Sequence, residues 1–278
     1  MLPSAWTRAS HTHRGLVLSY LDTAPDDRGK KPVIMLLHGF PDSAAMWSGV
    51  MSYLIDAGYR CVAPDTLGCG ESDMANTIDD YRMASVVSDY IALLDHLSIK
   101  SVSLMGHDWG SALAWCLAIH HPTRVSRLIG VSVGHPTAFA RAGFKQKLMS
   151  WYTVFFKLPI IPEAILLNDG PTGLAKLLPL HPGMSEVMQR MQKPGRFKAA
   201  LNIYRANLMS LLLKKYPPAQ CPVLGVWSHG DTYLGERQMA ASQHYVDGPF
   251  RLEKLEGGHW IPLDQPETLA RLALQFFA

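Results

Sequence analysis

The sequence lacks the features of a membrane-spanning, disulfide-stabilised or strongly charged protein. Four cysteines in 278 residues show no paired Cys-x-x-Cys spacing, so we expect neither a zinc site nor disulfides, and reduced thiols in the cytoplasm are the simplest interpretation. No apolar run approaches the roughly 18 residues that a spanning helix needs, and Met1 to His13 shows no apolar stretch typical of a signal peptide. Lys and Arg number 26 against 23 Asp and Glu, which argues against a nucleic-acid binder or a polybasic membrane binder.

Hydrophobic residues, in contrast, make up 48% of the chain, enough for a large core. Short apolar runs bounded by turn residues predict buried strands over 16–21, 33–37, 61–63, 102–105, 128–133 and 223–227, and a weaker run over 251–255. Helical patterns lie between them, most clearly over 81–97, where apolar residues recur with a period of 3.6. This alternation indicates an α/β fold with a mostly parallel central sheet flanked by helices.

The alternation of strands and helices stops over 136–217. That stretch is predicted to form helices broken at Pro159, Pro162, Pro171, Pro182 and Pro194. We therefore expect a core built from residues 1–135 and 218–278, with a helical cap inserted over 136–217. No internal repeat is present in the sequence.

A nucleophile-elbow pattern follows one of the predicted strands, in the segment Leu104-Met105-Gly106-His107-Asp108-Trp109-Gly110. Aspartate stands where an esterase carries serine. Neighbouring glycines suit a sharp, strained turn, because a Cβ there would keep the strand and the following helix apart. Amide N–H groups at the helix start should lower the pKa of Asp108 and keep it ionised. The structural alternative is a helix N-cap aspartate.

Two further residues complete a triad pattern. Asp231 and His259 each come directly after a predicted strand, in Ser228-His229-Gly230-Asp231 and Gly257-Gly258-His259. The order nucleophile, acid, histidine along the chain is that of α/β hydrolases, and the carboxyl ends of strands are where such sheets carry their sites. The segment Leu37-His38-Gly39-Phe40-Pro41 also follows a strand. The N–H groups of Phe40 and Trp109 are then expected to form an oxyanion hole.

An aspartate nucleophile selects a particular chemistry. A carboxylate attacking an acyl group gives only a mixed anhydride, so its useful target is a tetrahedral carbon with a leaving group. The product is an ester of Asp108, which His259, oriented by Asp231, hydrolyses by activating water. Epoxides and alkyl halides are the two substrate classes that fit.

The leaving group separates these two classes. An epoxide oxygen needs an acid, and a tyrosine is protonated at neutral pH. The predicted insertion contains Tyr152, Tyr204 and Tyr216, although tyrosines in helices are often packing residues. A halide instead needs N–H donors, and Trp109 serves either class.

These segments together resemble the epoxide hydrolases of the α/β-hydrolase fold, over nearly the whole chain. The resemblance is carried by His38-Gly39-Phe40-Pro41, Gly106-His107-Asp108-Trp109-Gly110, Leu201-Asn202-Ile203-Tyr204-Arg205, Asp231 and Gly258-His259. It implies a cap with two tyrosines that bind and protonate the epoxide oxygen. Tyr204 matches the Leu-Asn-x-Tyr-Arg segment of that family, and Tyr152, seven residues before Pro159, matches the second tyrosine.

The sequence thus predicts an epoxide hydrolase, a hydrolase acting on ether bonds, that yields vicinal diols. It needs no metal or organic cofactor. The expected substrates are a small apolar epoxide and water. We expect no nucleic-acid partner and no membrane span, and the sequence is compatible with a homodimer. Six aromatic residues suggest an apolar pocket, unless they belong to the core: Phe40, Trp47, Trp109, Trp151, Phe155 and Phe156.

Three alternatives remain open. A haloalkane dehalogenase shares the aspartate and the following tryptophan, but typically carries asparagine where this chain has Phe40. A fluoroacetate dehalogenase typically has arginine near the nucleophile, where this chain has Trp109. A ligand receptor on an inactive hydrolase fold is the third, and the intact triad argues against it.

Overall fold

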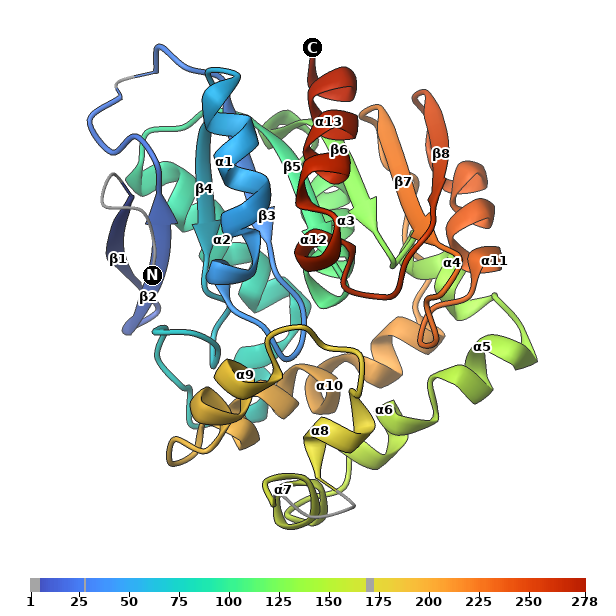
Figure 1. Ribbon diagram of the computed structural model, residues 1–278. Helices are drawn as coiled ribbons and strands as arrows, with labels where there is room; N and C mark the ends of the chain where they lie inside the picture. The colour runs from blue at the N-terminus through green and yellow to red at the C-terminus, as the bar shows by residue number, and fades with distance from the viewer. Residues whose placement is uncertain (1–5, 28, 169–172) are drawn as a thin grey trace.

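An eight-stranded sheet forms the centre of the computed structural model, which describes residues 6–27, 29–168 and 173–278 (Figure 1). The strand order is β1-β2-β4-β3-β5-β6-β7-β8. Strands β3 to β8 all run parallel to one another, whereas β2 runs antiparallel to β1 and β4. The expectation of a mostly parallel sheet is confirmed. The strands are β1 (Thr7–His13), β2 (Leu16–Asp22), β3 (Val33–Leu37), β4 (Arg60–Pro64), β5 (Val102–His107), β6 (Val125–Val131), β7 (Val223–Ser228) and β8 (Phe250–Leu255).

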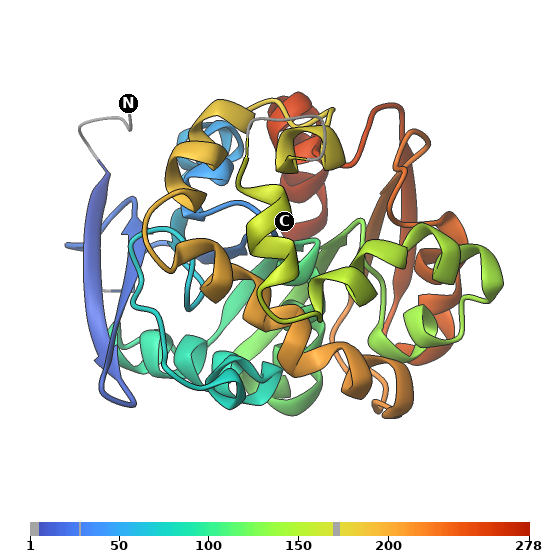
Figure 2. The same ribbon diagram turned by 90° about the horizontal axis from the view of Figure 1, so that it is seen from below.

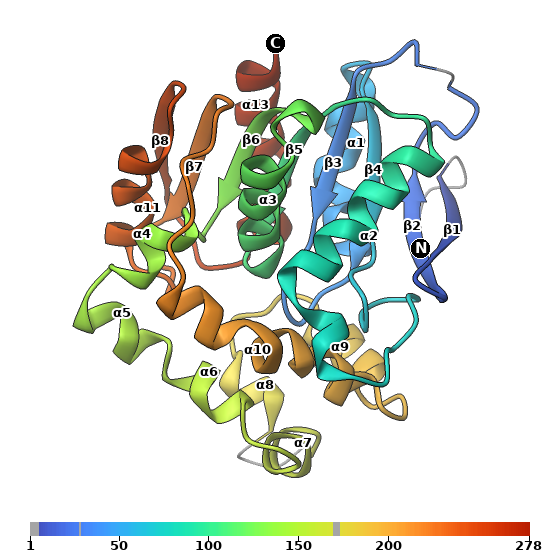
Figure 3. The same ribbon diagram turned by 180° about the vertical axis from the view of Figure 1, so that it is seen from behind.

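Helices cover both faces of the sheet, which explains why its central strands are apolar without alternation. On one face, α1 (Ser48–Asp56) packs against α13 (Pro266–Phe277), beside the short α12 (Ile261–Asp264). On the other face, α2 (Met83–His96) packs against α3 (Trp109–His120), as Figure 3 shows. Shorter elements are η1 (Ala44–Trp47), η2 (Ile78–Tyr81), η3 (Pro122–Arg124), α11 (Glu236–Ala240) and η4 (Ala241–Tyr245).

Between β6 and β7, the described residues form seven helices that lie together below the sheet in Figure 1; Figure 2 looks directly onto them. We call this segment the insertion. Its helices are α4 (Pro136–Ala140), α5 (Phe144–Met149), α6 (Trp151–Phe156), α7 (Ile161–Leu166), α8 (Leu174–Leu177), α9 (Met184–Met191) and α10 (Arg196–Leu213).

Most of the prolines predicted to break the helices of the insertion lie between helices, and one lies within a helix. Pro159, Pro182 and Pro194 lie between helices, as expected. Pro162, however, lies in the first turn of α7, where its missing N–H costs no hydrogen bond, so it begins a helix rather than breaking one. Pro171 lies outside the described residues.

Two strand predictions need correction. Strand β1 was not expected, because its sequence is polar; at this edge of the sheet four of its seven residues are exposed and only His11 is buried. Strand β6 begins at Val125 and ends at Val131, whereas the prediction covered 128–133. Ser132 has φ 66°, which no strand residue adopts, so the strand must end before it.

All four cysteines are free and buried, and burial raises the pKa of Cys61, Cys69 and Cys116 to about 12. Within the described ranges, no helix is both long enough and apolar enough to cross a membrane.

Candidate active site

Asp108 lies on a sharp turn between β5 and α3, at the carboxyl end of the sheet. Its backbone has φ 53° and ψ −123°, a conformation that costs an L residue about 1–3 kcal/mol. The flanking glycines make the turn possible, because a Cβ on Gly110 would overlap the carbonyl of Leu37 and one on Gly106 would overlap the carbonyl of Gly110. The strained elbow inferred from the sequence is therefore present.

The two carboxylate oxygens of Asp108 have different surroundings. Oδ1 accepts a hydrogen bond from the backbone N–H of Phe40 at 3.0 Å, and the backbone N–H of Trp109 also bonds to the carboxylate. Oδ2 lies 3.8 Å from Nε2 of His259. Both N–H groups expected from the sequence thus bond to the carboxylate, that of Phe40 through Oδ1, and Oδ2 faces the imidazole.

His259 is oriented by Asp231, as the motif predicts. Nδ1 of His259 donates to Oδ2 of Asp231 at 2.8 Å, while Oδ1 of Asp231 accepts the N–H groups of Tyr233 and Leu234 at 2.9 Å each. Both side chains are buried. The hydrogen bond fixes the proton of the neutral imidazole on Nδ1, so Nε2 is left to accept a proton on the side of Asp108.

The prediction of a lowered pKa for Asp108 is wrong. Burial raises the pKa, and the lowering by His259 and by the two backbone N–H groups does not offset that effect. Burial also acts on Asp231, yet the charge of His259 and the accepted hydrogen bonds hold the pKa of Asp231 below its usual value. Burial lowers the pKa of His259, but attraction to Asp231 and Asp108 leaves it raised overall.

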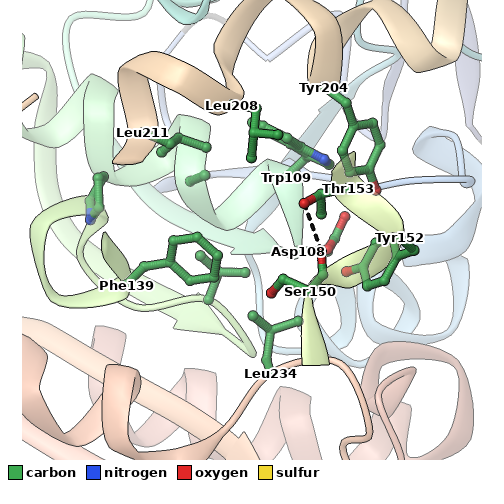
Figure 4. Close-up of a pocket in the computed structure, with 13 residues that line it drawn as sticks. Asp108, Trp109, Phe139, Ser150, Tyr152, Thr153, Tyr204, Leu208, Leu211 and Leu234 are labelled. Atoms are coloured by element: carbon green, nitrogen blue, oxygen red, sulfur yellow. Dashed lines mark hydrogen bonds between the residues drawn. The ribbon is translucent and has the colours of Figure 1, made fainter. Parts of the chain in front are cut away.

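Tyr152 from α6 and Tyr204 from α10 both lie beside Asp108 and line the same pockets. Figure 4 shows both hydroxyl groups directed at the Asp108 carboxylate from different sides. Burial, followed by the negative charge of Asp108, raises the pKa of both tyrosines well above the ordinary value, so both stay protonated. Tyr216 lies elsewhere, in a surface pocket with Lys214.

Two residues near the triad were missed by sequence reasoning. His107 is fully buried and donates from Nε2 to the carbonyl oxygen of His259 at 2.9 Å, and burial lowers its pKa to about 3. Tyr233 packs its ring against His259 and Tyr152, and its hydroxyl donates to the carbonyl of Leu177 at 3.1 Å. His107 is next to the nucleophile in sequence, which was a usable signal, whereas nothing in the sequence around Tyr233 marks these long-range contacts.

A pocket with a cavity volume of about 50 Å³ adjoins Asp108 (Figure 4). Of the six aromatic residues considered for an apolar pocket, Trp109 lines this one, while Phe40 and Phe156 line a smaller neighbour that also reaches Asp108. Trp47 instead belongs to the core on the α1 face of the sheet, and Trp151 is 59% exposed. Phe155 packs at the edge of the core and lines neither pocket.

Comparisons with known proteins agree with this geometry. The model of the alpha/beta hydrolase fold family matches residues 32–266. The chain is 32% identical over 267 residues to an AB hydrolase superfamily protein, YfhM, from Bacillus subtilis. The alignment covers 92% of this chain and 93% of that protein. The chain is 30% identical over 300 residues to epoxide hydrolase 3 from Xenopus tropicalis, covering 99% of this chain and 80% of that protein.

Solved structures give the same result. A structure described as a novel epoxide hydrolase of the alpha/beta hydrolases superfamily, from metagenomes of hot environments, superposes with a TM-score of 0.85 at 25% identity. The superposition covers 98% of both chains. Similarity therefore extends over the insertion as well as the sheet.

Proposed function

Since the chain belongs to the alpha/beta hydrolase fold family, with epoxide hydrolases among its full-length relatives, we propose that it hydrolyses epoxides to vicinal diols through a covalent ester on Asp108. One observation carries the proposal: two buried, protonated tyrosines point at a carboxylate that lies beside a His–Asp pair. An acid pair opposite a nucleophile is what ring opening of an epoxide requires.

In the first step, the hydroxyls of Tyr152 and Tyr204 bind the epoxide oxygen. Oδ2 of Asp108 attacks a ring carbon from the opposite side, the carbon–oxygen bond breaks, and its electron pair goes to the oxygen, which takes a proton from a tyrosine. The products of this step are a hydroxy ester of Asp108 and a tyrosinate.

In the second step, Nε2 of His259 takes a proton from water, which attacks the carbonyl carbon of the ester. Negative charge develops on Oδ1, which the N–H of Phe40 already faces, and the N–H of Trp109 bonds to the same carboxylate. The diol oxygen leaves with the proton from His259, and the remaining proton of the water returns to the tyrosinate. Atoms and charges then balance for the addition of one water.

Ester formation itself prepares His259 for this second step. The negative charge of Asp108 is one cause of the raised pKa of His259. Esterification removes that charge, so the pKa of His259 falls and the neutral, proton-accepting form becomes more populated. Asp231 keeps its charge and continues to hold the ring.

The test compares matched epoxides and alkyl halides with the purified protein, and measures diol and halide release. Diol without halide supports the proposal, whereas halide release on matched substrates supports a haloalkane dehalogenase. Binding of an epoxide without consumption supports a ligand receptor. In His259→Ala, mass spectrometry is expected to show one substrate mass added to Asp108 after a single turnover; repeated turnover at the wild-type rate contradicts the scheme.

The proposal extends to the organisation of the protein. Residues 1–135 and 218–278 form the hydrolase core, and residues 136–217 form a cap that excludes water and supplies the tyrosines. The substrates are a small apolar epoxide and water, without a metal or organic cofactor, and the enzyme works in the cytoplasm.

Exposed apolar side chains on α5 and α6, including Phe144 and Val154, offer a surface for a homodimer, which sedimentation would detect.

A further inference from the structure

Two pockets of unequal size meet at the reaction centre. Asp108, Tyr152 and Tyr204 line both of them, so a bound epoxide ring lies where the two pockets join. We call the larger pocket, lined also by Phe139, Ser150, Thr153, Leu208, Leu211 and Leu234, the long arm. We call the smaller, lined also by Phe40, Phe156, Leu178, Tyr233, His259 and Trp260, the short arm.

The long arm suits an extended apolar group. Its cavity volume is about 50 Å³, several times that of the short arm, and apart from Asp108 none of its lining residues carries a charge. It runs beside α10, which supplies Leu208 and Leu211, as Figure 4 shows. Ser150 and Thr153 on its wall are only partly buried, so this arm reaches the surface of the protein. An apolar substituent bound here is removed from water, and apart from Asp108 no charged side chain of the wall has to give up its hydration.

The short arm is narrow, and all of its lining residues except Tyr233 are buried. In the proposed mechanism it holds the hydrolytic water. Its cavity volume is about 10 Å³, and its walls include the fully buried Phe156 and the nearly fully buried Trp260. It has room for about one water molecule. His259 lines this arm and not the long one, so the water that it activates must stand in the short arm, beside the ester of Asp108.

We propose that the preferred substrates are terminal epoxides, with one long apolar substituent in the long arm and only hydrogen on the other ring carbon. This rests on the proposed epoxide hydrolysis and narrows its substrate class. A chain on the second ring carbon collides with the walls of the short arm and displaces the hydrolytic water, so it impairs both chemical steps.

The first test is a set of isomeric straight-chain epoxides of equal carbon number, terminal, cis-internal and trans-internal, assayed with the wild-type protein. Terminal epoxides are expected to exceed the trans-internal isomers in kcat/KM by about 10- to 200-fold, the range for misfit in an apolar pocket. Each added methylene on the terminal series should raise kcat/KM about fourfold until the long arm is full. Equal rates for terminal and trans-internal isomers overturn this inference but leave epoxide hydrolysis standing, whereas no diol from any isomer overturns both.

A pair of variants on α10 locates the substituent. Leu211 is 6% exposed in the long arm, and Leu213, two residues along, is 74% exposed outside it. Leu211→Trp, or the milder Leu211→Phe, is expected to lower the ratio of kcat/KM for the longest over the shortest terminal epoxide at least tenfold, while Leu213→Trp keeps the wild-type ratio. A wild-type chain-length profile in both folded Leu211 variants places the substituent elsewhere and overturns the inference.

Discussion

Asp108 and Asp231 are both buried carboxylates, yet their pKa values move in opposite directions. Asp231 receives two backbone N–H groups and the imidazole of His259, which more than offset its burial. Asp108 has fewer compensating partners, so burial prevails. The difference matches their proposed roles, because a stable anion orients a base well, whereas a less stabilised carboxylate is the better nucleophile.

Asp108 should therefore make the fold less stable at neutral pH. Because its pKa is raised by burial in the folded state, the folded protein binds a proton more readily than the unfolded chain, and stability falls as pH rises above the ordinary carboxyl pKa of about 4. Asp108→Asn keeps an oxygen for the N–H of Phe40 and removes the buried charge. We expect it to be more stable at pH 7, with a higher Tm than the wild type, and we expect the gain to shrink towards pH 4.

The control for this prediction is Asp56→Asn, because Asp56 lies on the exposed end of α1. Its Tm is expected to follow that of the wild type at both pH values. An Asp108→Asn protein with an unchanged or lower Tm at pH 7 contradicts the unfavourable burial of the charge.

The tyrosine hydroxyls can be tested singly and together. Tyr152→Phe or Tyr204→Phe removes one hydrogen bond to a developing alkoxide, and we expect ring opening to slow about 10- to 100-fold in pre-steady-state measurements. The double variant should lose nearly all ring opening while still forming the His259–Asp231 pair. Full activity of the double variant removes the assignment of the tyrosines as the acid pair.

At the scale of single residues, the sequence was informative where chemistry depends on neighbours along the chain. The elbow around Asp108 and the strand-end positions of Asp231 and His259 placed these three side chains correctly relative to the sheet. Tyr233 could not be found, because its contacts with Tyr152 and His259 join elements far apart in sequence. The pKa of Asp108 was missed for a related reason, since burial depends on the packed insertion.

At the scale of elements, one glutamine of α5 ties the insertion to the loop that follows β7. The Nε2 atom of Gln146 donates to the carbonyl oxygen of Tyr233 and to Ser150, and its Oε1 atom accepts the N–H of Gly235. That same loop supplies the N–H groups of Tyr233 and Leu234 to the carboxylate of Asp231. Gln146 is thus expected to act as a positioning residue for the acid of the triad.

Gln146→Leu leaves a carbonyl and an N–H group of that loop without their partner. We expect a loss of about 1–3 kcal/mol in the free energy of unfolding and a fall in kcat that exceeds the change in KM, because the His259–Asp231 pair is disturbed. The matched control is Gln192→Leu, at the exposed end of α9, which should behave as wild type. A normal kcat in a destabilised Gln146→Leu protein would leave the residue with a structural role only.

Elements with strong apolar patterns were predicted well, and the polar edge was not. Strand β3 has the predicted bounds, since its apolar run is buried between helices on both sides. Strand β1 pairs with β2 over all seven residues, but its one buried side chain is the polar His11, so no apolar pattern identifies it. Its backbone hydrogen bonds to β2 stabilise it instead.

At the scale of the whole molecule, the insertion and the sheet share one core. A single apolar cluster contains Phe40 and Trp109 of the core together with Phe156 and Tyr204 of the insertion. In addition, Asn207 of α10 accepts the N–H of Met83 and donates to the carbonyl of Tyr81, both at 2.8 Å. The two parts are therefore expected to unfold as one cooperative unit.

Thermal unfolding tests this expectation. Far-UV circular dichroism and tryptophan fluorescence should give coincident transitions for the wild type. Asn207→Leu, which leaves two buried backbone groups unpaired, should lower the common Tm. Two separate transitions in the wild-type protein would mean that the insertion unfolds independently of the sheet.

The covalent ester on Asp108 is the central claim, and isotope labelling tests it most directly. A single turnover is run in oxygen-18 water with enzyme in excess over a terminal epoxide, and both the diol and the peptide containing Asp108 are analysed by mass spectrometry. We predict that the first diol carries oxygen from the Asp108 carboxylate and no label, while Asp108 gains one oxygen-18 atom. Label in the first diol with none in Asp108 would mean that water attacks the epoxide directly, and would contradict the account.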